Sequence, residues 1–197
     1  MKSGLLVLGV IALIVVLGLG WAISVNNSLV TLDQGVRESW AQVQTVYQQR
    51  ADLVPNLVET VKGFAAQERT VLEEVTRARA SVAGIKVTPE VLNDPALLRR
   101  FQEAQTQLSG ALSRLLVTVE RYPELKSNQN FLALQNQLEG IENRVAGERR
   151  RFNESVRAYN TAIRTFPASL IASFRGFGEK PFFEAAPGSE AAPQIKF

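Results

Sequence analysis

The side chains available for chemistry in this 197-residue chain are carboxylates, guanidinium groups, amines, amides, hydroxyls and phenols, because the sequence has no His and no Cys. Those two residue types supply most zinc ligands, the thiolate nucleophiles and the commonest general base of enzymes. Their absence argues against zinc, haem and iron–sulfur sites and against Ser–His or Cys–His catalysis. Carboxylate-only catalysis and magnesium binding need neither residue and stay open. We expect no catalytic residue, no metal site, no cofactor and no enzymatic activity.

Several polar residues stand where a helical repeat calls for apolar ones. Arg50 and Glu68 interrupt an apolar seam, and a charge at such a position is tolerated when it is paired. We interpret them as part of an interhelical polar layer that fixes the register of packed helices; the alternative is a ligand or partner site inside the bundle. The predicted layer comprises Arg50, Glu68, Arg79, Arg149, Asn153 and Asn160.

Asn153 and Asn160 are one heptad apart, and an aromatic residue precedes each of them. The two amides therefore share one helical face. They are expected to bridge to Arg50 or Arg79 on a facing helix, or to backbone carbonyls left without a donor near Pro55.

A second unusual group is rich in Phe and lies near the C-terminus. It consists of Phe174, Phe177, Phe182 and Phe183, interleaved with Gly, Lys and Glu. Aromatic rings at this density need burial. They are expected either to pack back onto the rest of the chain or to contact a neighbouring subunit or a membrane surface, and we regard the two alternatives as equally open.

The element that sets the location of all these residues is an apolar run that begins at Leu5 and ends at Ile23. It contains no charge, and nineteen helical residues span roughly 28 Å, the thickness of a bilayer core. We predict a transmembrane helix over residues 5–23 after a short tail of residues 1–4. A cleaved signal peptide is the alternative, but the run is longer than the apolar part of such a peptide.

Beyond the span, apolar residues recur in steps of three and four from Val36 to Val82, which is typical of a helix packed against other helices. The prediction is an all-α protein: a transmembrane helix followed by an elongated antiparallel three- to four-helix bundle with coiled-coil-like packing over residues 25–177. Its helices are expected at about 28–83, 89–121, 127–166 and 168–176, and residues 178–197 are expected to form a flexible tail.

The first of these segments is much longer than the second. Pro55 cannot donate a helical hydrogen bond, so a kink or break there would fold the segment into two shorter helices. A straight helix would instead leave a membrane-proximal stalk whose seam needs other subunits.

Motifs spread along the chain resemble those of a known family. They are the run YQQRADLVPNLVETVKGFAAQE at 47–68, Ala78-Arg79-Ala80, Tyr122-Pro123-Glu124-Leu125, Arg149, Phe152-Asn153, Tyr159-Asn160, Phe166-Pro167 and the closing Gln194-Ile195-Lys196-Phe197. Together with the apolar N-terminus they closely resemble the LemA family. One departure is Phe152-Asn153, where Tyr-Asn is common in the family.

The resemblance implies a bacterial membrane protein with a helical-bundle domain, no established enzymatic activity and a loose link to membrane or envelope organisation. The predicted function is a structural or scaffolding protein of the bacterial envelope that self-associates or docks another membrane protein through its bundle. Alternatives are a lipid-binding or membrane-remodelling protein that acts through the Phe-rich segment, and a ligand sensor or carboxylate-dependent enzyme.

Charge supports no nucleic-acid partner, because 22 Lys and Arg are interspersed with 19 Asp and Glu and the net charge is only +3. The expected partners are membrane lipid around residues 5–23 and either further copies of this chain or another membrane protein. Lys2 precedes the span, and the first cation after it is Arg37. The positive-inside rule then predicts a single-pass protein of the cytoplasmic (inner) membrane with most of its mass outside the cytoplasm.

Overall fold

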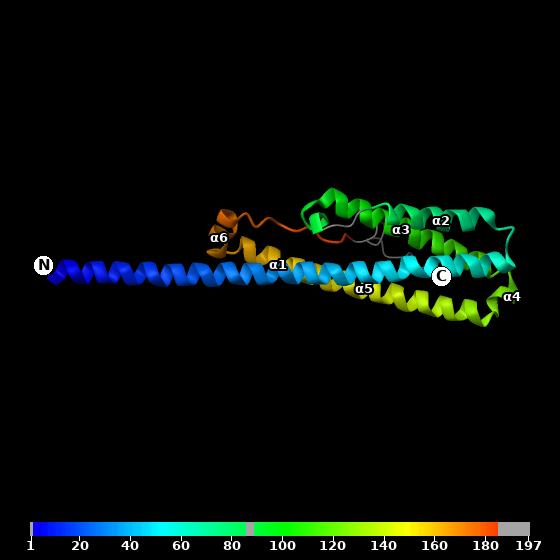
Figure 1. Cartoon of the computed structure of the whole chain (residues 1–197), viewed down its shortest axis with the longest axis horizontal. Helices are drawn as coiled ribbons and strands as arrows, with labels where there is room; N and C mark the ends of the chain where they lie inside the picture. Colours follow the sequence, from blue (N-terminus) through cyan, green and yellow to red (C-terminus); the bar gives the residue numbers. More distant parts are fainter. Residues whose placement is uncertain (1, 86–88, 185–197) are drawn as a thin grey trace, which may run out of the picture.

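The computed structural model describes residues 2–85 and 89–184, and every regular element within those ranges is a helix. The predicted all-α fold class is confirmed. The longest element, α1, runs from Lys2 to Phe64 without interruption. Its first third projects from the rest of the molecule as a single rod (Figure 1).

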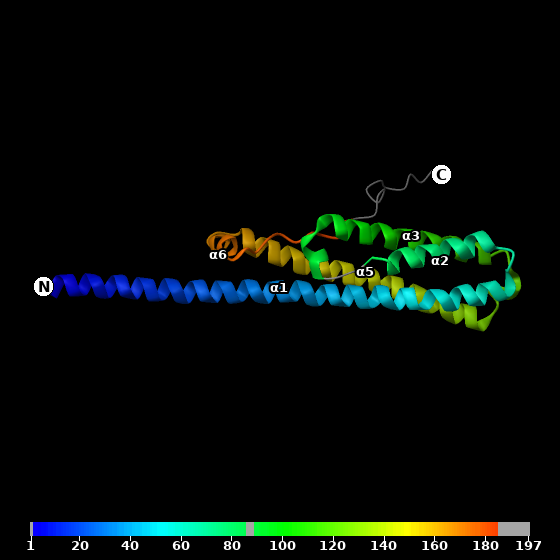
Figure 2. The same cartoon turned by 45° about the horizontal axis from the view of Figure 1, so that its top comes forward.

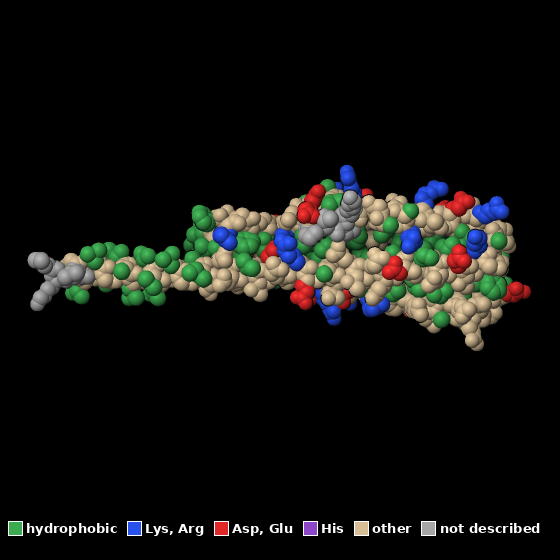
Figure 3. Space-filling view, viewed as in Figure 1, with side chains coloured by type: hydrophobic (Ala, Val, Ile, Leu, Met, Phe, Trp, Pro, Cys, Tyr) green, Lys and Arg blue, Asp and Glu red, His purple; other side chains and the backbone are tan. Residues whose placement is uncertain are grey.

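The projecting part of α1 contains the predicted span and exposes its apolar side chains, such as Leu13 and Leu17. It is long and apolar enough to cross a membrane. Figure 3 shows this rod carrying apolar side chains, whereas the Lys, Arg, Asp and Glu side chains gather on the bundle. Val25 and Leu29 are the first residues of α1 that pack against the core, so the bundle begins directly after the apolar run.

Four helices form the bundle: α1, α2 (Arg69–Ala83), α3 (Pro95–Val119) and α5 (Gln129–Arg164). Successive helices reverse direction; α5 packs along α1, and α2 packs along α3 (Figures 1 and 2). The described part of the chain also contains three short elements. The 3₁₀ helix η1 (Pro89–Asn93) precedes α3. Helix α4 (Pro123–Lys126) lies at the end of the bundle remote from the apolar rod, and α6 (Ala168–Arg175) lies at the end nearest to the rod.

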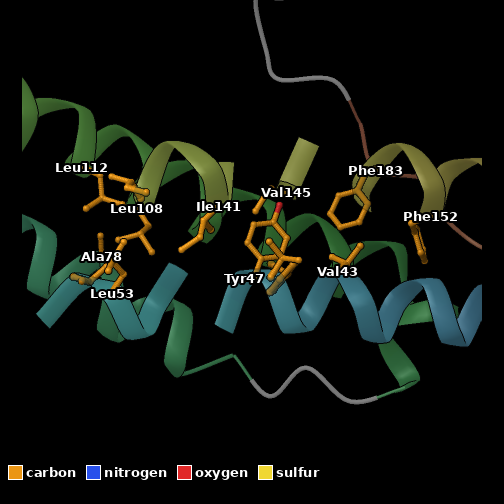
Figure 4. Packing of buried hydrophobic residues seen from close by; sticks show 14 of the residues in the cluster. Val43, Tyr47, Leu53, Ala78, Leu108, Leu112, Ile141, Val145, Phe152 and Phe183 are labelled. Carbon is orange, nitrogen blue, oxygen red and sulfur yellow. The ribbon is translucent and has the colours of Figure 1, made fainter. Parts of the chain in front are cut away.

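The core follows the predicted seam of α1, which is buried by the other helices of the same chain. An aromatic cluster lies at its centre: the ring centroid of Trp40 is 5.6 Å from that of Phe101 and 5.5 Å from that of Phe152. Figure 4 shows core side chains from α1, α2, α3 and α5 that lie between the helices along the bundle. No stretch of the seam between Leu29 and Val61 is left for another subunit to cover.

The helix expected at 28–83 is corrected to two helices, because the chain reverses at residues 65–68 between α1 and α2. The reversal places Leu72, Val75 and Ala78 against α3, whereas a straight helix would carry this apolar stripe away from the bundle. Tertiary burial outweighs the local helix propensity of the Ala-Ala-Gln-Glu sequence in the turn.

Helix α1 continues through Pro55, so no break occurs there. A proline at 55 leaves the carbonyl of Ala51, four residues earlier, without its helical donor. Arg79 of α2 replaces that donor, because its Nε donates to Ala51 O over 2.9 Å. The hydrogen bond explains how an interior proline is accommodated at the point where α2 packs on α1.

The other helix boundaries follow local capping. The helix expected at 89–121 begins instead at Pro95, because the Asp94 side chain accepts hydrogen bonds from Ala96 N and Leu97 N and so forms the N-cap. The helix expected at 127–166 spans Gln129–Arg164, with Asn128 as its N-cap. The short helix expected at 168–176 corresponds to α6, which ends at Gly176 with φ of 72°.

We expect Arg79→Met to reduce the free energy of unfolding of the full chain in mild detergent by about 1.5–3 kcal/mol, because it removes a charged donor from a carbonyl that has no other. In a Pro55→Ala background the same substitution should cost much less, since the backbone N–H restored at position 55 reaches Ala51 O. Chemical unfolding followed by circular dichroism measures both values.

Arg77→Met, at an exposed position of α2, is the matched control and should leave stability nearly unchanged. Equal costs of Arg79→Met in the two backgrounds would show that the hydrogen bond to Ala51 does not support the proline-containing turn.

Candidate functional site

Arg50 is the largest fully buried side chain of the bundle, with 1% of its surface exposed. It lies on α1 and reaches α3 and α5: Nη1 donates to Ser109 Oγ at 2.6 Å and to Glu142 Oε1 at 2.9 Å, and Nη2 donates to Gln105 Oε1. Its guanidinium also stacks over the Tyr47 ring, 5.0 Å from the centroid. The buried charge is therefore paired and hydrogen-bonded, as burial requires.

These contacts form the floor of a groove between α1, α3 and α5 with a volume of about 560 Å³. Three of its lining side chains hold buried N–H donors that have no acceptor among the described residues: Arg50 Nε, Gln102 Nε2 and Gln105 Nε2. A buried donor without an acceptor is costly, so such groups mark a position where an acceptor from outside is stabilising.

The rim of the groove carries both charge signs. Arg99 and Arg149 line it together with Glu103, Glu142 and Glu184. Burial raises the pKa of the Tyr47 phenol, which also lines the groove, although the Arg149 and Arg50 charges act against that increase. The groove therefore offers neutral and cationic donors at its floor and side chains of both charge signs at its edge.

The second polar arrangement holds the chain that follows α6 against α5. Asn160 forms two hydrogen bonds with one backbone residue: its Nδ2 donates to Lys180 O and its Oδ1 accepts from Lys180 N, each at 2.9 Å. Asn153 pairs in the same way with Phe183, at 3.0 Å and 2.9 Å. Each Asn amide thus pairs with the backbone of this segment as a neighbouring β-strand would. We call residues 177–184 the C-terminal strap.

The spacing of the two Asn residues matches that of the strap. Seven residues of helix rise about 10.5 Å, and three residues of extended chain cover about 10 Å. Asn160 and Asn153 can therefore pair with Lys180 and Phe183 in one register. Two further bonds fix the strap: Tyr159 OH donates to Gly178 O at 3.1 Å, and Arg149 Nη2 donates to Glu184 O at 2.8 Å.

Lys180 connects the strap to three other elements although only 6% of it is exposed. Its Nζ is 3.1 Å from Asp33 Oδ1 on α1, donates to Asn93 Oδ1 of η1 at 2.7 Å and lies 5.5 Å from the ring centroid of Tyr159 on α5. A buried ammonium group with these partners is compensated.

The groups around Lys180 titrate away from their ordinary ranges. Burial acts to raise the pKa of Asp33, but hydrogen bonds and charges from Arg37 and Lys180 outweigh it and hold this pKa below the ordinary value of 3.8. Burial, with the nearby Asp33 charge, raises the pKa of Tyr159 to about 12. At neutral pH the Asp33 carboxylate is therefore ionised beside a protonated Tyr159 phenol.

The Phe-rich group is divided by the structure. Phe183 is buried, with its ring centroid 5.3 Å from that of Phe152 and 5.9 Å from that of Trp40, and Figure 4 shows it among side chains of α1 and α5. Phe177 is half-buried, 6.5 Å from Tyr159 between centroids. Phe174 and Phe182 are exposed.

The six residues predicted as one polar layer lie in four places. Arg50 does bridge helices, and Arg79 supports α1 at Pro55. Glu68 lies in the α1–α2 turn, where its Oε1 accepts from Tyr122 OH at 2.7 Å and from Arg121 Nη2 at 3.0 Å. The hydrogen bond between Tyr122 and Glu68 raises the pKa of the Tyr122 phenol.

Asn153 and Asn160 contact the strap rather than a facing helix, which corrects the expected pairing with Arg50 or Arg79; Arg149 donates to the strap and also interacts with Tyr47 of α1. The expected flexible tail at 178–197 is likewise corrected for residues 178–184, which are held by these bonds; residues 185–197 lie outside the described ranges. The correction has a physical cause, since an Asn amide matches a backbone amide in both donor and acceptor.

Sequence reasoning missed Lys180 and its partners Asp33 and Asn93. A usable signal was present in the sequence. Phe183 lies three positions after Lys180, and three residues of extended chain cover about the same distance as the seven helical residues from Asn153 to Asn160. Among the described residues, no group of three or more Asp, Glu, His or Cys is placed to hold a metal ion.

The fold defines an all-α, membrane-associated class of protein in which one apolar helix, suited to a single membrane span, continues into a helical bundle. A family model described as the LemA family matches residues 39–197. This chain belongs to the LemA family, and the predicted family resemblance is confirmed.

Three curated relatives from two organisms are similar over most of the chain. The magnetosome protein MamQ of Magnetospirillum gryphiswaldense is 26% identical over 188 residues, covering 86% of this chain and 69% of the relative. The magnetosome proteins MamQ 2 and MamQ 1 of Paramagnetospirillum magneticum are each 24% identical with the same coverage.

We expect Asn160→Ala and Asn153→Ala to loosen the strap, because each leaves a backbone donor and acceptor of the strap unpaired at a cost of about 1–3 kcal/mol. Hydrogen exchange of the full chain in detergent should show faster exchange at Lys180 or Phe183, with the α2 and α3 amides unchanged. Asn136→Ala, at an exposed position of the same helix, is the control. Unchanged exchange at 178–184 in both strap variants would contradict the pairing.

The Asp33 carboxylate gives the strap a pH dependence. Because the folded-state pKa is depressed, this contribution to stability is present above the unfolded pKa of about 3.9 and is lost as pH falls through the folded value. The stability difference between the native chain and Asp33→Asn should therefore shrink as the pH is lowered from about 6 to about 3, an interval that includes that unfolded pKa, and thermal unfolding measures it. A difference that stays constant over this interval would argue against the ionised pair.

Proposed function

We propose that this chain is a non-catalytic structural protein of the bacterial envelope, anchored by α1, that docks a partner protein through its bundle. The single observation that carries the proposal is the set of buried donors without acceptors in the groove: Arg50 Nε, Gln102 Nε2 and Gln105 Nε2. An extended polypeptide segment provides carbonyl and carboxylate acceptors at a spacing that suits such a groove.

The strap supports this choice of partner. The bundle already holds one extended segment on α5 through side-chain amide and guanidinium groups that pair with its backbone. Arg149 and Glu184, at the end of the described strap, also line the groove. The groove therefore adjoins the surface of α5 that already binds the extended backbone of the strap.

Docking of a partner is better supported than self-association through the heptad seam. The heptad seam of α1 is the sequence feature that predicts oligomers. The same chain buries this seam from Leu29 to Val61, so it is not available to a second copy. The polar and charged lining of the groove is also typical of regulated or transient protein contacts rather than of an obligate apolar interface.

The location that we propose is the cytoplasmic membrane, crossed once by residues 5–23, with the bundle on the extracytoplasmic side. The support is the cation Lys2 before the span and the absence of another cation before Arg37.

Site-specific photocrosslinking tests docking in the groove. A photoreactive residue replaces Thr106, which lines the groove, or Asn136, which is exposed on α5 away from it, in the full chain within its own membrane. We expect a discrete adduct from position 106 and none from position 136. Gln102→Leu should reduce the yield at position 106 several-fold, because it removes a buried donor at similar side-chain volume.

The circular dichroism spectrum and melting temperature of Gln102→Leu should match those of the native chain, so that a lost adduct reports docking and not unfolding. Three results would overturn the proposal: equal adducts from both positions, no adduct from position 106, or an adduct whose mass equals two copies of this chain. The last result would assign the groove to self-association instead.

A further inference from the structure

Helix α6 exposes large apolar side chains on the face that points away from the bundle. Leu170 is 62% exposed and Phe174 is 90% exposed, and Phe166, four residues before Leu170, is 76% exposed. Residues four apart share one helical face, so Leu170 and Phe174 form a continuous outward stripe, and Phe166 is exposed in the turn just before the helix. An outward-facing helix surface in water is ordinarily polar.

The opposite face of α6 is already occupied. Ala172 is 2% exposed, and Ile171 packs against the core. Helix α6 contacts both α1 and α5, and Gly176 then turns the chain back into the strap. The stripe cannot be buried by rotating α6, because rotation would expose Ala172 and Ile171 and pull on the strap.

The position of α6 identifies what lies against the stripe. Both cartoon views place α6 at the end of the bundle that faces the apolar part of α1 (Figures 1 and 2). The apolar run of α1 ends at Ile23, and Val25 is the first residue of α1 that packs against the core. Two residues of helix rise only about 3 Å, so the end of the bundle lies at the expected boundary of the bilayer.

The anchor carries an independent marker of that boundary. Trp21 is 42% exposed on α1 near the end of the apolar run, where an indole ring favours the headgroup layer. Arg175 stands in the last turn of α6, next to Phe174. Apolar rings flanked by a cation are typical of helices that lie in the interface of a membrane.

We propose that the stripe formed by Leu170 and Phe174, together with the exposed Phe166 ring, inserts into the headgroup layer of the bilayer that α1 spans. The bundle then has two attachments to one membrane: the span and the α6 stripe beside it. A single helix leaves a bundle free to tilt about its anchor, whereas two attachments at different points fix its orientation. A docking groove between α1, α3 and α5 would thereby be held at a constant height and direction above the lipid.

Site-directed spin labelling tests this insertion directly, because the chain has no native Cys and every introduced Cys is unique. The variants Phe174→Cys and Leu170→Cys are labelled in the full chain, reconstituted into phosphatidylcholine–phosphatidylglycerol vesicles. Collision of the label with oxygen, which concentrates in lipid, is compared with collision with a water-soluble nickel chelate.

Two exposed apolar positions provide matched references. Leu13→Cys lies within the span at 58% exposure, and Val117→Cys lies near the end of α3 remote from the membrane at 71% exposure. We expect the ratio of oxygen to chelate collision at positions 170 and 174 to exceed that at 117 several-fold and to fall below that at 13, as suits an interfacial depth.

Either of two results would overturn the proposal. Ratios at 170 and 174 equal to that at 117 would place α6 in water. Low collision with both reagents, together with broadening by a neighbouring label, would show that a second copy of the chain covers the stripe instead of lipid.

Discussion

The structure depends on the burial of one apolar seam, which runs along α1 from Leu29 to Val61. A single neighbouring helix covers only one side of such a seam, so several elements of the chain are needed to bury it. Helix α5 lies along it, α2 and α3 fold back over its remote half, and η1 with the C-terminal strap completes the half near the apolar rod. Each turn of the chain is placed where it removes part of this seam from water.

Several polar side chains of the bundle complete backbone hydrogen bonding instead of pairing with a side chain of a facing helix. Arg79 replaces the donor that Pro55 lacks, and Asn153 and Asn160 supply the strand-like partner that an extended strap needs. Among the described residues Arg50 fits the usual description of a buried charge between helices, and the groove that it lines holds three buried donors without acceptors. The same cost of unsatisfied polar groups therefore explains both the internal stability of the fold and the place where a partner is expected.

Three structural features meet at the end of the bundle near the apolar rod. Helix α1 leaves the predicted bilayer there, α6 turns the chain, and Lys180 ties the strap to Asp33 and Asn93. Mechanical continuity between anchor and bundle is the result, because α1 passes through this region without a linker. A partner held in the groove would thus be held at a set distance from the membrane and not on a flexible tether.

The sequence by itself determined the apolar span, the all-α class and the seam, because each follows from local spacing that one helix carries alone. The family was determined by motifs spread along the chain. It also singled out Arg50, Arg79, Asn153 and Asn160 as polar residues needing partners. Only the tertiary structure decided who those partners are and where α1 ends, since Ala65 to Glu68 contains no residue that stops a helix. A side-chain amide pairs equally well with any exposed backbone amide. Its partner was therefore set by which segment, 20 or 30 residues further along the chain, the packed helices bring beside it.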